Sequence, residues 1–398
     1  MKKAFTRFVP FLLPISLSSY AQIPGLAPEK DWDLNGYVKY MATSTIPNSG
    51  DTIFDHIVHQ RFNFEYRVND QLRVNLGMRN RLLFGDSADY PNYGDFISYD
   101  PGYVDLSKNW IDKEGMVGNS QFDRAYLNWN KDDWQFRAGR FRINWGMTTV
   151  WNPNDIFNSY SIYDFDYEER PGTDAIMVTK RLGFASSIDV VFNPNSDCEL
   201  NSYAARYLFN HQGWDMQVLL GKSHLDYVVG AGIAGDIYGA GLRGEFSWFE
   251  PTQDSYQLEG STQQEELIAS SVSSVEMDYR FDGTQNWVIQ GSLMYISEPQ
   301  DTGNAMAYLN LPLSARTLSF THWTWYSSLG VDISPLSRFT FMNSYYGDGS
   351  YFVGVNQTYS LADDWELLGV AQYFDGKNNS VFGESPSTLL YAQIKWSF

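Results

Sequence analysis

Segments of about ten residues that alternate apolar and polar side chains recur along this chain, and the connectors between them alternate between short and long. Short turns are predicted at Asn69-Asp70, Lys131-Asp132-Asp133, Leu182-Gly183, His211-Gln212-Gly213, Gly235-Asp236, Asp282-Gly283-Thr284, Ser334-Pro335 and Ala362-Asp363-Asp364. Longer connectors lie near 43–55, 86–120, 146–172, 250–270, 298–318 and 376–386. We therefore predict an all-β fold, a transmembrane antiparallel β-barrel of about 18 strands with short periplasmic turns and long outer loops. Sixteen strands is the alternative, because 298–325 is ambiguous.

The tryptophans support a barrel, because Trp prefers the membrane interface and is expected to flank the ends of transmembrane strands. Five lie within a few residues of a predicted short turn, namely Trp129, Trp134, Trp214, Trp287 and Trp365. Three more are predicted to form the girdle at the opposite end, namely Trp145, Trp248 and Trp323. A soluble β-sandwich would bury its tryptophans in mid-strand, so we favour the membrane barrel.

The last predicted strand ends on an aromatic residue. Apolar side chains occupy every second position from Leu390 to Phe398, and the intervening positions are mainly polar. This segment resembles the terminal strand of Gram-negative outer-membrane proteins, whose last Phe is read by the barrel assembly machinery. The resemblance implies that Phe398 is an assembly signal, and that the protein resides in the outer membrane of a Gram-negative bacterium.

The N-terminus has the three parts of a secretory signal peptide, which are a basic start, an apolar run from Phe8 to Leu17 and the small-x-small sequence Ser19-Tyr20-Ala21. We predict a signal peptide over 1–21, a periplasmic segment over 22–33 and the barrel over 34–398.

Composition narrows the function further. Removing the three cations of the signal peptide changes the formal net charge from −19 to −22, which argues against nucleic-acid binding. The single cysteine, Cys198, cannot form an internal disulfide. Mean hydropathy is −0.36, and beyond the N-terminus no run of 18 apolar residues suggests a transmembrane helix.

Arginines gather on one predicted face of four strands. Alternation directs nine of them into the lumen between residues 61 and 142, provided that a bulge at Ala138-Gly139 restores the register. The eight that we predict to line the pore are Arg61, Arg73, Arg79, Arg81, Arg124, Arg137, Arg140 and Arg142. Two interpretations stay open: the arginines concentrate anionic solutes, or they brace the barrel by pairing with the lumen acids Glu65, Asp189, Asp215, Glu245, Glu276 and Asp278.

A distinctive stretch runs from Gly139 to Asp174 and contains GRFRINWG, WNPND and EERPGTD. The stretch is similar to alginate-export porins and related uncharacterised barrels, in which a GRxxxxWG strand leads into an NPxD loop and an R-P-G return. The resemblance implies a passive or facilitated channel whose loop packs against the arginine-lined wall. This chain has strongly acidic outer loops, unlike the alginate exporters, which argues against polysaccharide export.

We predict that loop 146–172 folds inward and narrows the channel, because its carboxylates can pair with the arginines that precede it. Its predicted constriction residues are Asn152, Pro153, Asp155, Asp166, Glu168, Glu169 and Arg170. Acids also cluster in 86–114, but their spacing matches no compact calcium loop, so we predict a solvated acidic rim and no metal site.

The sequence thus predicts an outer-membrane channel for small hydrophilic, anionic solutes, with no cofactor and no enzymatic activity. The five histidines are scattered, and neither GxSxG nor HExxH occurs. The expected partners are outer-membrane lipid and lipopolysaccharide, the barrel assembly machinery and the solute. The alternatives are an oligosaccharide-specific channel, and a surface adhesin or assembly partner on a barrel scaffold. The sequence does not specify the oligomeric state.

Overall fold

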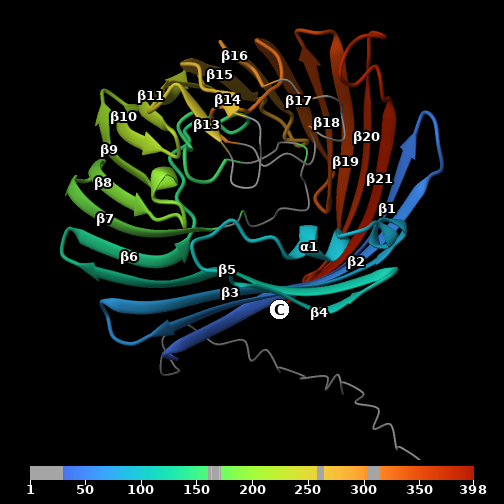
Figure 1. Cartoon of the computed structure of the whole chain (residues 1–398), viewed down its shortest axis with the longest axis horizontal. Helices are drawn as coiled ribbons and strands as arrows, with labels where there is room; N and C mark the ends of the chain where they lie inside the picture. Colours follow the sequence, from blue (N-terminus) through green and yellow to red (C-terminus); the bar gives the residue numbers. More distant parts are fainter. Residues whose placement is uncertain are drawn as a thin grey trace, which may run out of the picture. The chain divides into compact units, whose positions relative to one another are not determined.

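Eighteen antiparallel strands form a closed barrel, as the alternating pattern predicts (Figure 1). The computed structural model describes residues 30–159, 163, 170, 172–257, 264–300, 302, 308 and 314–398, and the predicted signal peptide lies outside them. The sheet contains 19 strands, of which β4 is an addition to the ring. Among the described residues, no helix is long and apolar enough to cross a membrane.

The strands of the ring follow one another in chain order. They are β1 (Trp32–Pro47), β2 (Ile53–Arg67), β3 (Leu72–Gly85), β5 (Met116–Lys131), β6 (Trp134–Phe141), β7 (Thr173–Gly183), β8 (Ser186–Asn193), β9 (Ser202–His211), β10 (Trp214–Ser223), β11 (Asp226–Ile237), β12 (Ala240–Pro251), β15 (Ser270–Arg280), β16 (Val288–Ile296), β17 (Trp323–Ser334), β18 (Ser337–Tyr346), β19 (Ser350–Ala362), β20 (Trp365–Gly376) and β21 (Ser387–Ser397). The elements outside the ring are η1 (Asp86–Asp89), α1 (Tyr93–Ser98), β4 (Ser107–Lys113), η2 (Cys198–Leu200), β13 (Ser255–Gln257) and β14 (Gln264–Glu266).

The ring closes where the first strand pairs with the last. Residues 37–47 of β1 pair in antiparallel register with 387–397 of β21. Beyond that ladder, Gly36 and Phe398 exchange two backbone hydrogen bonds of 3.0 and 2.9 Å, and the Phe398 ring contacts Phe62 and Trp396. Closure leaves neither strand with an unpaired edge.

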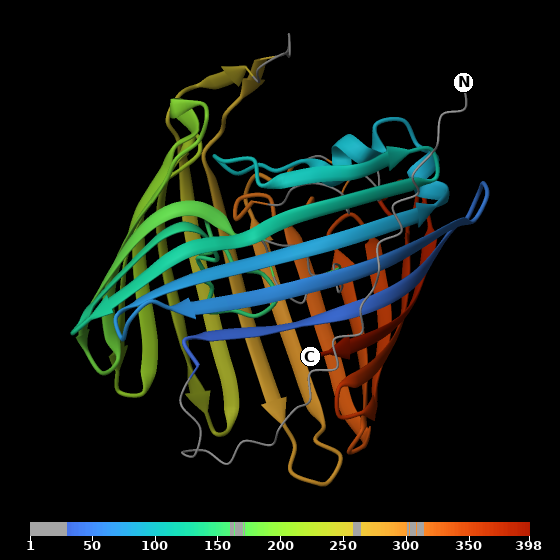
Figure 2. The same ribbon diagram turned by 90° about the horizontal axis from the view of Figure 1, so that it is seen from below.

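The two ends of the barrel differ, as Figure 2 shows: hairpin turns connect the strands at one end, and most of the long connections lie at the other. Two predicted turns are misplaced: β7 and β8 reverse at Phe184-Ala185 and not at Leu182-Gly183, and β11 and β12 reverse at Tyr238-Gly239 and not at Gly235-Asp236. Gly239 has a φ of +84° and Tyr238 of +54°, so this pair supplies the left-handed conformations that the tight reversal needs. The prediction also missed three shorter connections at the loop end, at 194–201, 224–225 and 347–349.

Side chains alternate between an outward apolar face and an inward face. In β10, Val218 and Leu220 are 48% and 64% exposed, whereas Gln217 and Leu219 are buried. The predicted tryptophan girdles are partly confirmed. Exposed tryptophans stand near the short turns (Trp134, Trp287 and Trp365) and near the loop end (Trp248 and Trp323). Trp145 is the exception, because it is buried against Phe157.

The predicted bulge at Ala138-Gly139 is wrong, since β6 pairs with β5 and β7 without a register shift. The irregularity lies in β5, where Asp123 has no partner in β3. Gly139 instead allows close approach, because a Cβ at this position would lie 2.3 Å from the carbonyl oxygen of Ala125, and its φ is +119°. β6 ends at Phe141, and β4 pairs with the part of β5 beyond the end of β6.

Candidate functional site

A basic cluster occupies the inward faces of β1, β2 and β3. Lys39, Arg61, Arg79 and Arg81 all exert their positive charge on His59, which is 3% exposed. The sequence analysis placed the three arginines in the lumen but missed Lys39 and His59. Alternation along β1 and β2 could have found both, since each lies on the face opposite the outward aromatic residues.

Some arginines of this wall are paired with acids. Arg61 donates to Asp123 in a bidentate pair of 2.5 and 3.0 Å, and both side chains are buried. Nearer the short-turn end, Arg73 is 45% exposed and lies 3.4 Å from Glu65. Arg61 therefore links β2 to β5 across β3, and Arg73 links β3 to its neighbour β2, so both brace the wall, which is one of the two predicted roles.

Other arginines donate to neutral oxygens. Arg79 donates to the side-chain oxygen of Gln121 at 2.7 and 3.2 Å. Arg81 donates to the side-chain oxygen of Asn119 at 2.9 Å and to the carbonyl oxygen of Ile97 at 3.0 Å. These neutral acceptors fix the orientation of the two guanidinium groups.

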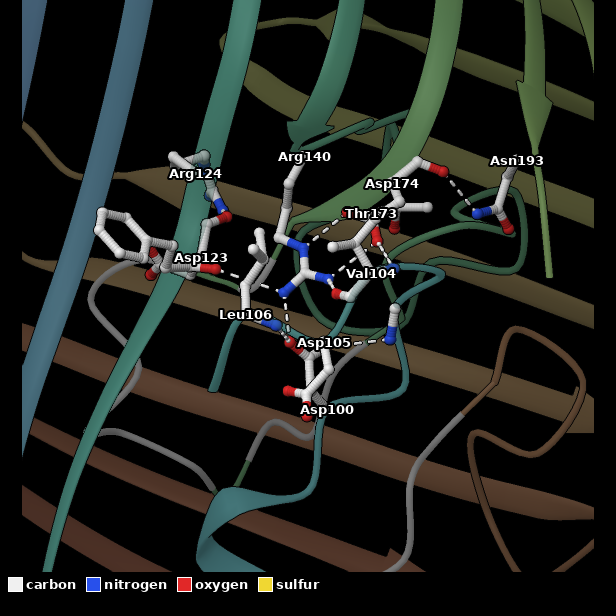
Figure 3. Close-up of polar contacts among 12 residues, drawn as sticks. Asp100, Val104, Asp105, Leu106, Asp123, Arg124, Arg140, Thr173, Asp174 and Asn193 are labelled. Carbon is white, nitrogen blue, oxygen red and sulfur yellow. Dashed lines mark hydrogen bonds and ion pairs between the residues drawn. The ribbon is translucent and has the colours of Figure 1, made fainter. Parts of the chain in front are cut away.

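Arg140 lies where β6 ends, and it joins three parts of the chain (Figure 3). It makes a bidentate pair with Asp174 of β7 at 2.7 and 2.8 Å, and it donates to Asp100 at 2.6 Å. It also donates to the carbonyl oxygens of Val104 and Phe122. Because Arg140 is 3% exposed and saturated with acceptors, its position fits a structural clamp better than a pore lining.

The remaining predicted arginines lie along the same side of the barrel. Arg124 donates to the carbonyl oxygen of Arg170 at 2.5 Å and thereby links β5 to the return of the 142–172 connection. The Arg137 guanidinium lies 4.7 Å from the centre of the Phe141 ring. Arg142 is half-buried immediately after β6.

Residues 142–159, which we call the inner segment, leave the wall after β6 and pack against the inward face of the barrel. Ile143, Trp145, Val150, Trp151 and Ile156 are all at most 5% exposed. They join one apolar cluster with inward residues of the eight strands β7–β12, β15 and β16, including Ala204, Leu219, Val228, Phe249 and Val272. The amide of Gln217 donates to the carbonyl oxygen of Trp145 at 2.6 Å. A water-filled lumen is normally lined by polar side chains. The inward apolar side chains of this barrel instead pack against the inner segment.

Two wall carboxylates hold the backbone of the inner segment. Glu245 of β12 accepts hydrogen bonds from the backbone N–H groups of Met147, Thr148 and Asn154. Glu276 of β15 accepts from those of Thr149 and Val150, at 2.8 and 3.0 Å. Glu245 and Glu276 were predicted as possible partners of arginines. Only Glu276 has an arginine partner among the described residues, Arg243 at 3.0 Å.

The Asn-Pro-Asn-Asp corner is buried within this contact. The Asn152 side chain donates to the Thr148 hydroxyl at 3.0 Å, and the N–H of Asp155 donates to the carbonyl oxygen of Asn152 at 3.0 Å. The Ser247 hydroxyl of β12 donates to the carbonyl oxygen of Pro153 at 2.9 Å. The corner thus lies directly on the wall.

Asp155 is fully buried, and neither of its carboxylate oxygens accepts a hydrogen bond of regular geometry. Burial raises the pKa of Asp155 to about 7, and the negative charge of Glu245 adds to the effect, whereas Arg142 and Arg170 oppose it. The predicted ion pair between Asp155 and the arginine wall is therefore not formed. Asp166, Glu168 and Glu169 lie outside the described residues.

An aromatic cluster lies on the opposite side of the barrel. Tyr163 contacts the rings of Phe352 on β19 and Phe374 on β20, with centroids 4.8 and 5.6 Å away. Its backbone carbonyl accepts a hydrogen bond from the Gln372 side chain at 3.2 Å. The connection that packs on β12 and β15 thus also reaches β19 and β20, a contact about which the sequence analysis made no prediction.

The described residues contain no group of three acids, histidines or cysteines that could hold a metal ion. His56 lies on the outward face and accepts or donates one hydrogen bond with the Tyr40 hydroxyl at 2.8 Å. His59 faces inward, so these two histidines do not share a site.

Solved structures of similar fold are outer-membrane proteins. No known family matches the sequence, and no curated protein matches it. Pseudomonas aeruginosa OccK11 (OpdR) superposes with a TM-score of 0.56 at 9% identity, covering 92% of this chain and 96% of that one. Acinetobacter baumannii OccAB4 gives 0.56 at 8% identity, with 92% and 98% covered. P. aeruginosa OpdK with vanillate gives 0.54 at 9% identity, with 92% and 98% covered.

Sequence identities this low show a common fold and nothing more. The resemblance of the 139–174 stretch to alginate-export porins stays a prediction. The closed 18-stranded ring, its outward apolar face and the near-complete coverage of these neighbours agree with one another. The chain has the fold of an outer-membrane porin.

Proposed function

We propose that the protein is an outer-membrane channel for small hydrophilic, anionic solutes, and that it has no enzymatic activity. The observation that supports this proposal is the basic cluster, because four cations, of which Arg61 is paired with Asp123, converge on one stretch of the inward face. Channel selectivity follows the charge that lines the lumen more than the net charge of the chain. Two buried carboxylates of the wall on β12 and β15, Glu245 and Glu276, accept hydrogen bonds from the backbone of the inner segment.

The inner segment also forms the proposed constriction of the channel. The inner segment occupies space between the wall and the centre of the barrel, so solutes would pass between this segment and the basic cluster. In this arrangement the short-turn end faces the periplasm, and Phe398 is the residue presented to the barrel assembly machinery. The outward apolar face contacts lipid and lipopolysaccharide.

Reversal potentials in a planar bilayer with a salt gradient test the anion preference. We expect the unmodified protein to favour the anion, and the double variant Arg79→Gln, Arg81→Gln to lose most of that preference, because two fixed lumen charges are removed. Arg181→Gln, an exposed change at the short-turn end, is the control. Cation selectivity that the double variant leaves unchanged would refute the proposal.

A further inference from the structure

The inner segment depends on the charge state of the carboxylates that hold it. Glu245 and Glu276 are 4% and 0% exposed, and they lie on the neighbouring strands β12 and β15. Together they accept the backbone N–H groups of the four consecutive residues 147–150. Such charge-assisted bonds are strong only while the acceptors are ionised.

Glu245 uses both of its oxygens as acceptors. Oε1 accepts from Met147, from the N–H of Thr148 at 2.7 Å and from its hydroxyl at 3.1 Å, and Oε2 accepts from Asn154 at 2.9 Å. A proton on either oxygen would face a donor, so the packed inner segment requires Glu245 as a carboxylate.

Asp155 is a second buried carboxyl group beside this anchor. The charged groups that act on it are Arg142 and Arg170 from its own connection and Glu245 from β12. On β15, Glu276 is compensated by Arg243. The backbone N–H of Trp145 is directed at the Asp155 carboxyl, but neither oxygen makes a hydrogen bond of regular geometry and both are buried, so the packed segment accommodates this group in its neutral form.

We propose that Glu245 and Glu276 set the width of the channel by holding the inner segment on the wall, and that ionisation of Asp155 beside Glu245 releases this hold at alkaline pH. The inference rests on the proposed channel function. Below neutrality the pair carries one negative charge, which the backbone N–H groups stabilise. Above neutrality it carries two in a site without water, and separation of the segment from the wall relieves their repulsion.

Single-channel conductance, recorded in planar bilayers between pH 5 and pH 9 in symmetric salt, tests the inference. We expect the conductance to rise about twofold as the pH increases through neutrality, because the segment withdraws from the lumen. Asp155→Asn removes the titrating group and keeps the shape of the side chain, so this variant is expected to stay in the narrow state throughout. A conductance that is constant with pH in the unmodified protein overturns the inference, as does a rise that Asp155→Asn retains.

Glu245→Gln tests the anchor separately, because its amide nitrogen would face a backbone N–H donor. We expect this variant to conduct at pH 5 as the unmodified protein does at pH 9. The matched control is Glu366→Gln on β20, whose carboxylate lies 3.1 Å from Lys395 and is far more exposed. A Glu245→Gln pore of unchanged conductance contradicts the anchoring role. If this variant does not fold, the pH titration of the unmodified protein still decides. Failure of the folded protein to conduct at any pH would overturn both the channel function and this inference.

Discussion

Arg140 shows how one side chain can hold the point at which the chain leaves the barrel wall. Its guanidinium joins the end of β6 to Asp174 at the start of β7 and to Asp100 of the preceding long connection. All of these groups are at most 10% exposed, so removal of the cation leaves two carboxylates uncompensated.

We therefore expect Arg140→Gln to lower the free energy of unfolding by about 3–5 kcal/mol, the usual effect of breaking a buried ion pair on one side. Urea unfolding in detergent micelles, followed by tryptophan fluorescence, measures the change. Arg73→Gln is the control, because its 45% exposed pair with Glu65 is expected to contribute about 0–1 kcal/mol. Equal midpoints for the two variants would contradict the clamp.

For individual residues, the sequence predicted which side chains face the lumen better than it predicted their bonding partners. Alternation correctly placed Arg61, Arg79 and Arg81 inward. Alternation could not reveal that Glu245 binds backbone N–H groups. Almost every residue has a backbone N–H, so the residue types do not show which of these groups a side chain will contact. Asp155 was expected to pair with an arginine, but its corner buries it without a hydrogen bond of regular geometry.

Among the elements of the fold, the inner segment determines which inward side chains of the barrel are covered. The predicted strand over 133–145 stops at Phe141, since the apolar residues that follow bury themselves against the inward face of β7–β16 and not against lipid. Period-two alternation cannot distinguish these two apolar environments, which is why the sequence extended the strand too far.

Deletion of 150–168 tests whether this connection narrows the channel. We expect the single-channel conductance to increase about twofold or more, because the deleted residues include the Asn-Pro-Asn-Asp corner, which is bonded to β12, and Val150, which is bonded to β15. The control is deletion of 255–266, which includes the β13–β14 hairpin that projects from the loop end in Figure 2. An equal conductance for the two deletions would show that the connection does not constrict the pore.

For the whole molecule, the strand count and the alternation of short turns with longer connections were predictable because each strand carries its own pattern. The path of the 142–172 connection was not, since it depends on contacts with strands more than 200 residues away, such as that of Tyr163 with Gln372. Short local patterns do not specify such distant partners.

The closed barrel predicts heat-modifiable migration on a denaturing gel. An unheated sample in detergent is expected to run as a compact band, and boiling to shift it to the position of the unfolded chain, because all strands of the ring are hydrogen-bonded on both sides. A folded, detergent-free soluble protein would contradict a membrane barrel with this outward apolar face.

The pairing of β1 with β21 means that the barrel can close only after its last strand has arrived at the membrane. The ladder from Tyr37↔Ser397 to Pro47↔Ser387 joins the two extremes of the ring, so none of its hydrogen bonds can form until translocation has delivered the final strand. Until that moment β1 presents an unpaired edge, which is a template for the wrong neighbour. On the proposed export to the outer membrane, we therefore expect the chain to need a chaperone or an insertion catalyst that covers this edge for the whole interval between the arrival of its first strand and that of its last.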